Sequence, residues 1–134
     1  MLILNNDNAK DDLVYPKLSY KIVGIIYDVY NELGYGYQEK YYQKALAIRF
    51  NKYHINYTQQ IGIDLEFDNH KIGKYILDFL IENKIILELK VGQYFYKKDY
   101  EQIRAYLKAQ KLRLGMLILF TKNDVKIKRI INKI

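Results

Sequence analysis

Hydrophobic residues that recur at helical spacing predict two helices in the first third of the chain. The first spans residues 18–33, and Gly34 and Gly36 end it because glycine adopts the left-handed conformation without steric cost. The second starts near Tyr37 and runs to about Lys52. The apolar positions of the two helices are Leu18, Ile22, Ile25, Ile26, Val29 and Leu33, then Tyr41, Tyr42, Ala45, Leu46 and Phe50.

In the middle of the chain the apolar period changes to two, which predicts strands. Residues 61–67 alternate apolar with polar or small side chains and indicate a half-buried strand. Residues 68–71 form a turn, residues 72–81 a second strand and, after a short turn at residues 83–84, residues 85–91 a third. Because short turns join antiparallel neighbours, these three strands form a meander.

The last part of the chain predicts a helix at residues 98–110, an apolar strand at residues 115–120 and a basic amphipathic helix at residues 126–134. A helix between two strands of one sheet makes a right-handed crossover, after which the next strand runs parallel. The expected architecture is therefore an α/β fold in the order α-α-β-β-β-α-β-α, with a mixed sheet of about four strands flanked by helices.

The chain of 134 residues has the length of one domain. We expect a loose N-terminal leader at residues 1–16 and a single domain at residues 17–134. The longest apolar run, residues 116–120, is far too short to span a bilayer, and residues 1–4 lack a basic segment typical of a secretory signal. The absence of cysteine excludes disulfides and thiolate metal sites and is typical of a cytoplasmic protein.

The net charge of +7 lies in the second half of the chain. Residues 1–83 hold 9 basic and 11 acidic side chains, whereas residues 84–134 hold 13 basic and 4 acidic ones. A basic half is typical of a phosphate-binding surface, so nucleic acid is the expected partner. A solvated surface is the alternative, and charge alone leaves both open.

Three charged residues stand in strands that are otherwise apolar. Asp78 lies in the second strand, and Glu88 and Lys90, two residues apart in the third, point to the same face. Counted from the turn between the strands, the two carboxylates lie close to opposite each other. Burying both is unfavourable unless a cation compensates, and oxygen ligands alone favour Mg²⁺ or Mn²⁺ over Zn²⁺. The alternative is a surface ion pair between Glu88 and Lys90.

Gln102 and Tyr106 are four residues apart and share one face of the following helix. An amide and a phenol there can orient a phosphate or a water. The alternative is a tyrosine at the edge of the core beside an exposed glutamine.

These residues, taken in order, resemble the PD-(D/E)XK nuclease superfamily, and within it the small family of GxxExxY (or GxxExxR) proteins. The resemblance covers residues 17–131, although Leu77 stands where the superfamily has its proline. The motifs that carry it are Gly36-Tyr37-Gln38-Glu39-Lys40-Tyr41-Tyr42, Gly73-x-Tyr75-x-x-Asp78, Ile86-Leu87-Glu88-Leu89-Lys90, Gln102-x-x-x-Tyr106-Leu107 and Gly115-x-Leu117-x-x-Phe120.

The resemblance implies a restriction-endonuclease-like core and a nuclease that hydrolyses phosphodiester bonds, of DNA rather than RNA, with Mg²⁺ or Mn²⁺. Asp78, Glu88, the backbone carbonyl of Leu89 and Glu39 are then the metal ligands. Lys90 positions the attacking water, and Gln102 and Tyr106 support the site.

Two rival hypotheses belong to other functional classes. One is a non-catalytic nucleic-acid-binding or assembly module that keeps the nuclease fold. The other is a homodimer with a tyrosine-rich interface, since the chain has fifteen tyrosines.

Overall fold

The computed structural model describes residues 14–133, which form three helices and five strands. The expected sequence of two helices, three strands, a helix and a strand is confirmed. In chain order the elements are α2 (Pro16–Leu33), α3 (Glu39–Lys52), β1 (Tyr57–Phe67), β2 (His70–Ile81), β3 (Ile85–Val91), α4 (Lys97–Gln110), β4 (Leu114–Phe120) and β5 (Val125–Ile131).

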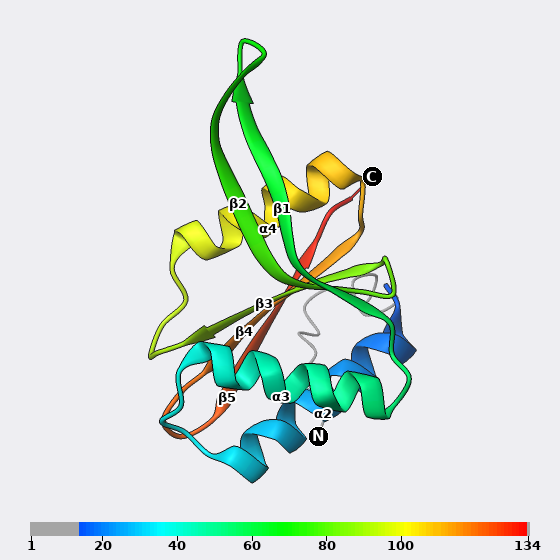
Figure 1. Ribbon diagram of the computed structural model, residues 1–134, viewed down its shortest axis with the longest axis vertical. Coiled ribbons are helices and arrows are strands. Elements are labelled where there is room, and N and C mark those ends of the chain that lie inside the picture. Colours follow the sequence, from blue (N-terminus) through cyan, green and yellow to red (C-terminus); the bar gives the residue numbers. More distant parts are fainter. Residues whose placement is uncertain (1–13, 134) are drawn as a thin grey trace.

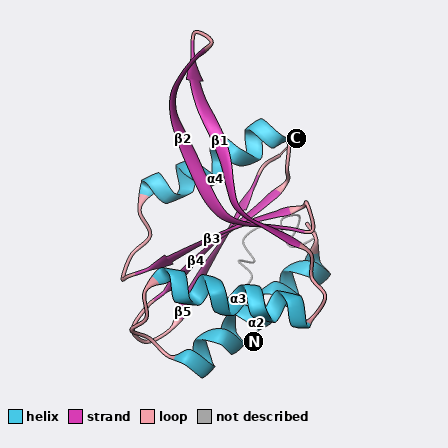
Figure 2. Cartoon of the chain, viewed as in Figure 1, coloured by secondary structure: helices cyan, strands magenta, loops and turns pink. Residues whose placement is uncertain are grey.

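The strands form one mixed sheet in the order β1-β2-β3-β4-β5. β3 and β4 are parallel, and the other neighbours are antiparallel, as expected if α4 makes the crossover. Helices α2 and α3 cover one face of the sheet and α4 covers the other (Figures 1 and 2). Two hydrophobic clusters follow from this arrangement, a large one under α2 and α3 and a smaller one under α4.

The end of the chain differs from the prediction: residues 125–131 form a strand, not a helix. Val125 and Ile127 are buried while Lys126 and Lys128 between them are exposed, which is the period of a strand. All seven residues of β4 are buried, so this strand needs a partner on its outer side, and β5 pairs with it along its whole length. The sheet therefore has five strands rather than about four.

Strands β1 and β2 form a hairpin that projects beyond the body of the sheet (Figure 1, green). They pair from Tyr57 opposite Ile81 to Phe67 opposite His70, whereas β2 pairs with β3 only over its last three residues. Asp68 and Asn69 at the tip both have positive φ, of 50° and 63°, which is typical of a tight hairpin turn. β2 thus leaves β3 after a short contact, and the sheet forks there.

The glycine pair ends α2 as predicted. Gly34 has φ 78°, and its N–H donates to the carbonyl of Tyr30 at 2.7 Å. Its own carbonyl accepts the hydroxyl of Tyr42 from α3 at 2.5 Å. This contact ties the end of α2 to the first turn of α3, and it fixes where Glu39 begins α3.

Most of the predicted leader, residues 1–13, lies outside the described residues, as does Ile134. Val14 is 2% exposed and belongs to the large hydrophobic cluster, and Pro16 is already the first residue of α2. Within residues 14–133, none of the helices is both long and apolar enough to cross a bilayer.

Candidate active site

Asp78 and Glu88 face each other at the fork between β2 and β3. The backbone ladder of these strands ends at the pair Phe79 and Leu87, one residue earlier. Beyond this pair, hydrogen bonds from backbone to side chain replace the backbone ladder. The backbone N–H of Asp78 donates to Oε1 of Glu88 at 3.0 Å, and the N–H of Leu89 donates to Oδ2 of Asp78 at 2.7 Å. The facing position predicted for the two carboxylates is therefore present, and both side chains are more than nine-tenths buried.

Helix α3 contributes two side chains to this fork. The amide of Gln43 donates through Nε2 to Oδ1 of Asp78 at 2.8 Å. Glu39 lies one turn earlier, on the same face of the helix. It is close enough to Asp78, Lys90 and Asp99 for their charges to shift its pKa. The first turns of α3 thus face the carboxylates of the sheet.

Lys90 lies between two carboxylates from different elements. Its Nζ is 3.6 Å from Oε2 of Glu88 and 3.8 Å from Oδ1 of Asp99. Asp99 is in the first turn of α4, where its Oδ2 accepts the backbone N–H of Tyr96 at 3.1 Å, which caps the helix. Its other oxygen, Oδ1, is buried and has no hydrogen-bond partner. Asp99 therefore holds the lysine by charge alone.

The fork explains how side chains from both layers meet. Helix α3 packs in the cluster on one face of the sheet and α4 in the cluster on the other. In a continuous sheet, a layer packed on either face lies about 10 Å from the strands, so the sheet would separate the two helix layers. Because β2 leaves β3 at Asp78, the layers are open to each other there. We call the five side chains that gather at this opening, Glu39, Asp78, Glu88, Lys90 and Asp99, the fork cluster.

Burial dominates the ionisation of the fork cluster. It raises the pKa of Asp78, although the N–H of Leu89 lowers it in part. It raises the pKa of Glu88 to about 9, helped by the charge of Asp78. Burial and then the charge of Asp78 also raise the pKa of Glu39. Fully ionised, the cluster would therefore hold more negative charge than its surroundings stabilise, and its carboxyl groups hold their protons more tightly than exposed ones do.

The lysine responds in the opposite way to the same charges. Burial alone would lower the pKa of Lys90, but the nearby carboxylates, Glu88 first, outweigh burial and raise it. Lys90 is consequently a firmly held cation at physiological pH. It offsets one of the four carboxyl groups, and the others need protons or another positive charge.

The donor chemistry of the fork cluster fits a hard divalent cation in part. Asp78 and Glu88 offer carboxylate oxygens whose raised pKa values show that they lack compensation. Among residues 14–133, however, no three His, Cys, Asp or Glu side chains are grouped so as to hold a metal ion. The two carboxylates would therefore bind a cation together with backbone oxygen and water, which Mg²⁺ accepts because it usually keeps several waters.

Gln102 and Tyr106 lie along α4, after Asp99. Tyr106 is 4% exposed and packs in the smaller hydrophobic cluster with Leu77 and Ile103, where burial raises its pKa. Gln102 is half-buried one turn before it. Within the described part of the chain, no hydrogen bond joins either side chain to the fork cluster.

Sequence reasoning missed Gln43 and Asp99. A signal for Gln43 was available, because it follows Glu39 by four residues and so shares its helix face. Asp99 carries no such signal in the sequence, because it lies at the start of a helix, where an acidic residue is common. Only the path of the chain from β3 to α4, which returns Asp99 to Lys90, gives it a second role.

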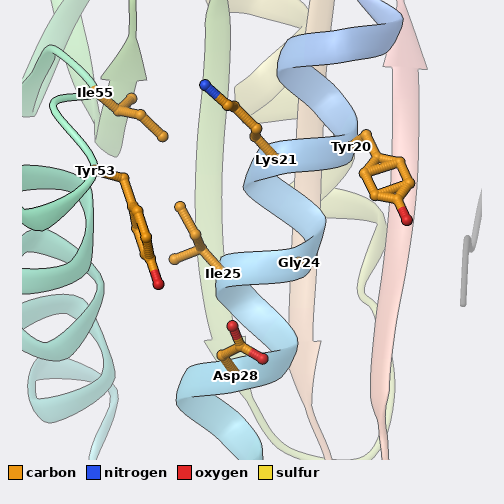
Figure 3. Close-up of a pocket in the computed structure, with 7 residues that line it drawn as sticks. All are labelled: Tyr20, Lys21, Gly24, Ile25, Asp28, Tyr53 and Ile55. Atoms are coloured by element: carbon orange, nitrogen blue, oxygen red, sulfur yellow. The ribbon is translucent and has the colours of Figure 1, made fainter.

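Two surface grooves lie outside the fork cluster. One, of about 330 Å³, lies between α2 and the end of α3 and is largely apolar (Figure 3). The exposed side chains of Tyr20 and Tyr53 line this groove. Gly24 also lines it, and no neighbouring atom occupies the space where a side chain would be. The other, of about 680 Å³, lies between the loop after β3 and the start of β5.

Comparisons with known proteins agree with this fold. A family model described as the PD-(D/E)XK nuclease superfamily matches residues 16–130. Among solved structures, the chain is similar to "Crystal structure of SSO0001", with a TM-score of 0.53 and 15% identity over 94% of this chain. It spans 61% of that protein's length, so this likeness concerns the fold. No curated protein matches the chain. The helices and the mixed sheet form a restriction-endonuclease-like core, and the chain belongs to the PD-(D/E)XK nuclease superfamily.

Proposed function

We propose that this protein is a metal-dependent nuclease that hydrolyses phosphodiester bonds, of DNA rather than RNA. The observation that carries the proposal is the meeting of Asp78, Glu88 and Lys90 at the fork of β2 and β3, with two hydrogen bonds that join the carboxylates to the facing backbone. Phosphodiester hydrolysis depends chiefly on placing charges around the phosphate. Desolvated carboxylates beside a firmly charged lysine suit this chemistry.

The cofactor in this proposal is Mg²⁺ or Mn²⁺. When bound, such an ion acidifies a water molecule and offsets negative charge on the phosphate. Asp78 and Glu88 would hold it, with the backbone carbonyl of Leu89 as a third ligand. Glu39 would add its carboxylate through a bound water, because no three acidic side chains among residues 14–133 are grouped so as to hold the ion directly. Oxygen donors without thiolate or imidazole favour these ions.

Lys90 has the central role among the residues of this chain. Its ammonium would orient the attacking water and face the phosphate oxygens. Glu88 and Asp99 hold Nζ between them, so little motion remains to be lost on substrate binding. Gln43 keeps the carboxylate of Asp78 in place, and Gln102 with Tyr106 would support the site from α4.

Further assignments belong to the same proposal. The order of the motifs supports the GxxExxY family, and the lack of cysteine suits a cytoplasmic location. A homodimer would use the exposed tyrosines of the molecule, such as Tyr20 and Tyr53 beside the groove on α2. Light scattering tests this assignment, and a monomeric mass would remove it.

A non-catalytic binding module is the second candidate, and one observation favours it. Both oxygens of Asp78 already accept hydrogen bonds, from Leu89 and Gln43, and no three-residue ligand group is found among the described residues. Such a site could remain without a metal. The module would bind nucleic acid through its basic half and yield no product.

Cleavage of labelled single- and double-stranded DNA and RNA, with Mg²⁺ or Mn²⁺ and with EDTA, separates the two candidates. We expect metal-dependent product from the wild type and a loss of about 100-fold or more in Asp78→Asn, Glu88→Gln and Lys90→Ala. Glu101→Gln, an exposed residue of α4, is the matched control and should cleave normally. Binding without product from a folded protein would support the module instead.

A further inference from the structure

The larger groove is continuous with the loop that leaves the proposed active site. After Lys90, the chain passes Val91 and turns at Gly92, whose N–H donates to the carbonyl of Phe120 at 3.1 Å. The next residues, Tyr94 and Phe95, form one wall of the groove. The same loop then enters α4, where Asp99 holds Lys90. Whatever lies in the groove is therefore within one short loop of the fork cluster.

The opposite wall is the start of β5, and its lysines lie on the same face of the sheet as Lys90. Leu119 of β4 pairs with Lys90 on one side and with Lys126 on the other. Leu117 likewise pairs with Glu88 and with Lys128. Residues opposite each other in neighbouring strands share a face, and two strand spacings amount to roughly 10 Å. Lys126 and Lys128 on the edge strand thus lie on the same face of the sheet as Lys90 and Glu88, with one leucine of β4 between the two strands in each row.

The charges of the groove favour an anion. Lys126 and Lys128 are exposed, and neither takes part in an ion pair among the described residues. Asp124 also lines the groove, and its carboxylate, which accepts a hydrogen bond from the hydroxyl of Thr121, offsets part of this positive charge. The lysines are therefore the groups free to meet phosphate.

The aromatic wall favours bases that are not stacked in a duplex. Phe95 is anchored against Tyr100, with ring centroids 5.9 Å apart, whereas Tyr94 next to it is 71% exposed. An exposed ring can stack on a base only when a face of that base is free. A groove of about 680 Å³ has the size of a small-molecule site, too small for a double helix about 20 Å across but sufficient for a nucleotide or two.

We infer that this groove binds a single-stranded segment of the nucleic acid, with a base stacked on Tyr94 and phosphates on Lys126 and Lys128, while the neighbouring phosphate lies at Lys90. The inference rests on the proposed function and names the form of its substrate. The roughly 10 Å between β3 and β5 is short enough for the one or two nucleotides in the groove to place the neighbouring phosphate at Lys90. The protein would thus act next to an unpaired end or a gap.

Binding measured without metal tests this inference separately from cleavage. The probe is a fluorescein-labelled oligothymidylate of about 12 nucleotides in EDTA, with a blunt duplex of equal length for comparison. We expect Tyr94→Ala to weaken binding of the single strand about 5- to 100-fold, Tyr94→Phe to keep wild-type affinity, and neither to change duplex binding. The pair Lys126→Gln with Lys128→Gln should lose at least about tenfold and lower the salt slope by about 1.4.

The matched control is the pair Lys108→Gln with Lys111→Gln, two exposed lysines at the end of α4. An equal loss in this control, wild-type affinity in Tyr94→Ala, or no binding of the single strand by the wild type would overturn the inference. If the groove variants bind poorly but the wild type never cleaves, the groove stands and the nuclease proposal fails. If the wild type cleaves and the groove variants bind and cleave normally, the nuclease proposal stands and the inference about the groove fails.

Discussion

The acidic residues of the fork cluster repel one another when ionised, which indicates a binding function. Four carboxylates surround one lysine, and burial raises the pKa of Asp78, Glu88 and Glu39. A cluster shaped only by stability would replace such groups with apolar ones, because uncompensated buried charge is costly. The hydrogen bonds to Leu89 and Gln43 hold the carboxylates in place without neutralising them.

The first prediction concerns Glu88 in the metal-free protein. Folding raises the pKa of this carboxyl from 4.5 to about 9, so the folded state binds the proton more tightly than the unfolded state. Its contribution to stability is complete below about pH 4.5 and is lost as the pH rises toward about 9. We expect Glu88→Gln to increase the free energy of unfolding at about pH 8.5 by about 1–3 kcal/mol and to reduce its decline with pH.

Urea unfolding in EDTA between about pH 5 and pH 9 measures this effect. Glu66→Gln, an exposed glutamate of the hairpin, is the control and should follow the wild-type curve. A decline in Glu88→Gln as steep as in the wild type would mean that Glu88 does not carry the charge cost.

The second prediction concerns Gln43, which touches Asp78 but is no ligand in the proposal. Gln43→Ala leaves Oδ1 of Asp78 without its donor, and we expect Mg²⁺ affinity to fall about 10- to 100-fold, as for other residues that orient ligands. Titration calorimetry of the folded variants measures the affinity. Gln38→Ala, at the exposed residue before α3, should keep wild-type affinity. Unchanged affinity in Gln43→Ala would exclude this orienting role.

At the scale of elements, the sequence predicts the features that depend on the local hydrophobic pattern. It misses those that depend on strand pairing within the sheet. The bounds of β3 agree with the predicted strand because its apolar run lies between two clear turns. The sequence predicts a helix at residues 126–134, because a short segment of lysines and isoleucines fits either period. The fully buried β4 selects the strand by offering an unpaired edge, which is a tertiary effect.

The candidate active site shows the same difference between residues visible in the local pattern and residues placed by the tertiary fold. Asp78, Glu88 and Lys90 could be found because a charge in an apolar strand is visible in the sequence. Asp99 could not, since its approach to Lys90 depends on the course of the loop before α4. The resemblance to the nuclease superfamily implies a supporting role for Tyr106, while its spacing leaves a position at the edge of the core open; the structure places it in the smaller hydrophobic cluster under α4.

The third prediction tests β5 as an element of the fold. Ile127 packs in the large hydrophobic cluster, whereas Lys128 next to it points to solvent. Ile127→Ala should lower the free energy of unfolding by about 2 kcal/mol, and Lys128→Ala by no more than about 0.5 kcal/mol. Urea unfolding measures both. Equal effects of the two substitutions would contradict the alternation of a strand.

At the scale of the whole molecule, the fork joins the two layers and so couples metal binding to global stability. Glu39 on α3, Asp78 on β2, Glu88 on β3 and Asp99 on α4 repel one another in one opening. An ion bound only by the folded chain stabilises it by mass action, about 2.7 kcal/mol when the free ion is at 100 times its Kd. The melting temperature therefore reports on the proposed metal site without any substrate.

The fourth prediction is that Mg²⁺ raises the Tm of the wild type and that the increase grows with pH. The cation must displace protons held by carboxyls of raised pKa, above all the one on Glu88, whose pKa is about 9. Fewer protons remain to be displaced at pH 8.5 than at pH 6, so the ion binds more tightly and the Tm rises further. Thermal unfolding followed by circular dichroism, with Mg²⁺ and with EDTA at both pH values, measures the increase. It should vanish in Glu88→Gln and persist in Glu66→Gln, because only the first removes a proposed ligand. An equal increase in all three proteins would mean that the ion binds elsewhere on the molecule. The buried charges of the fork cluster would then have no bound cation.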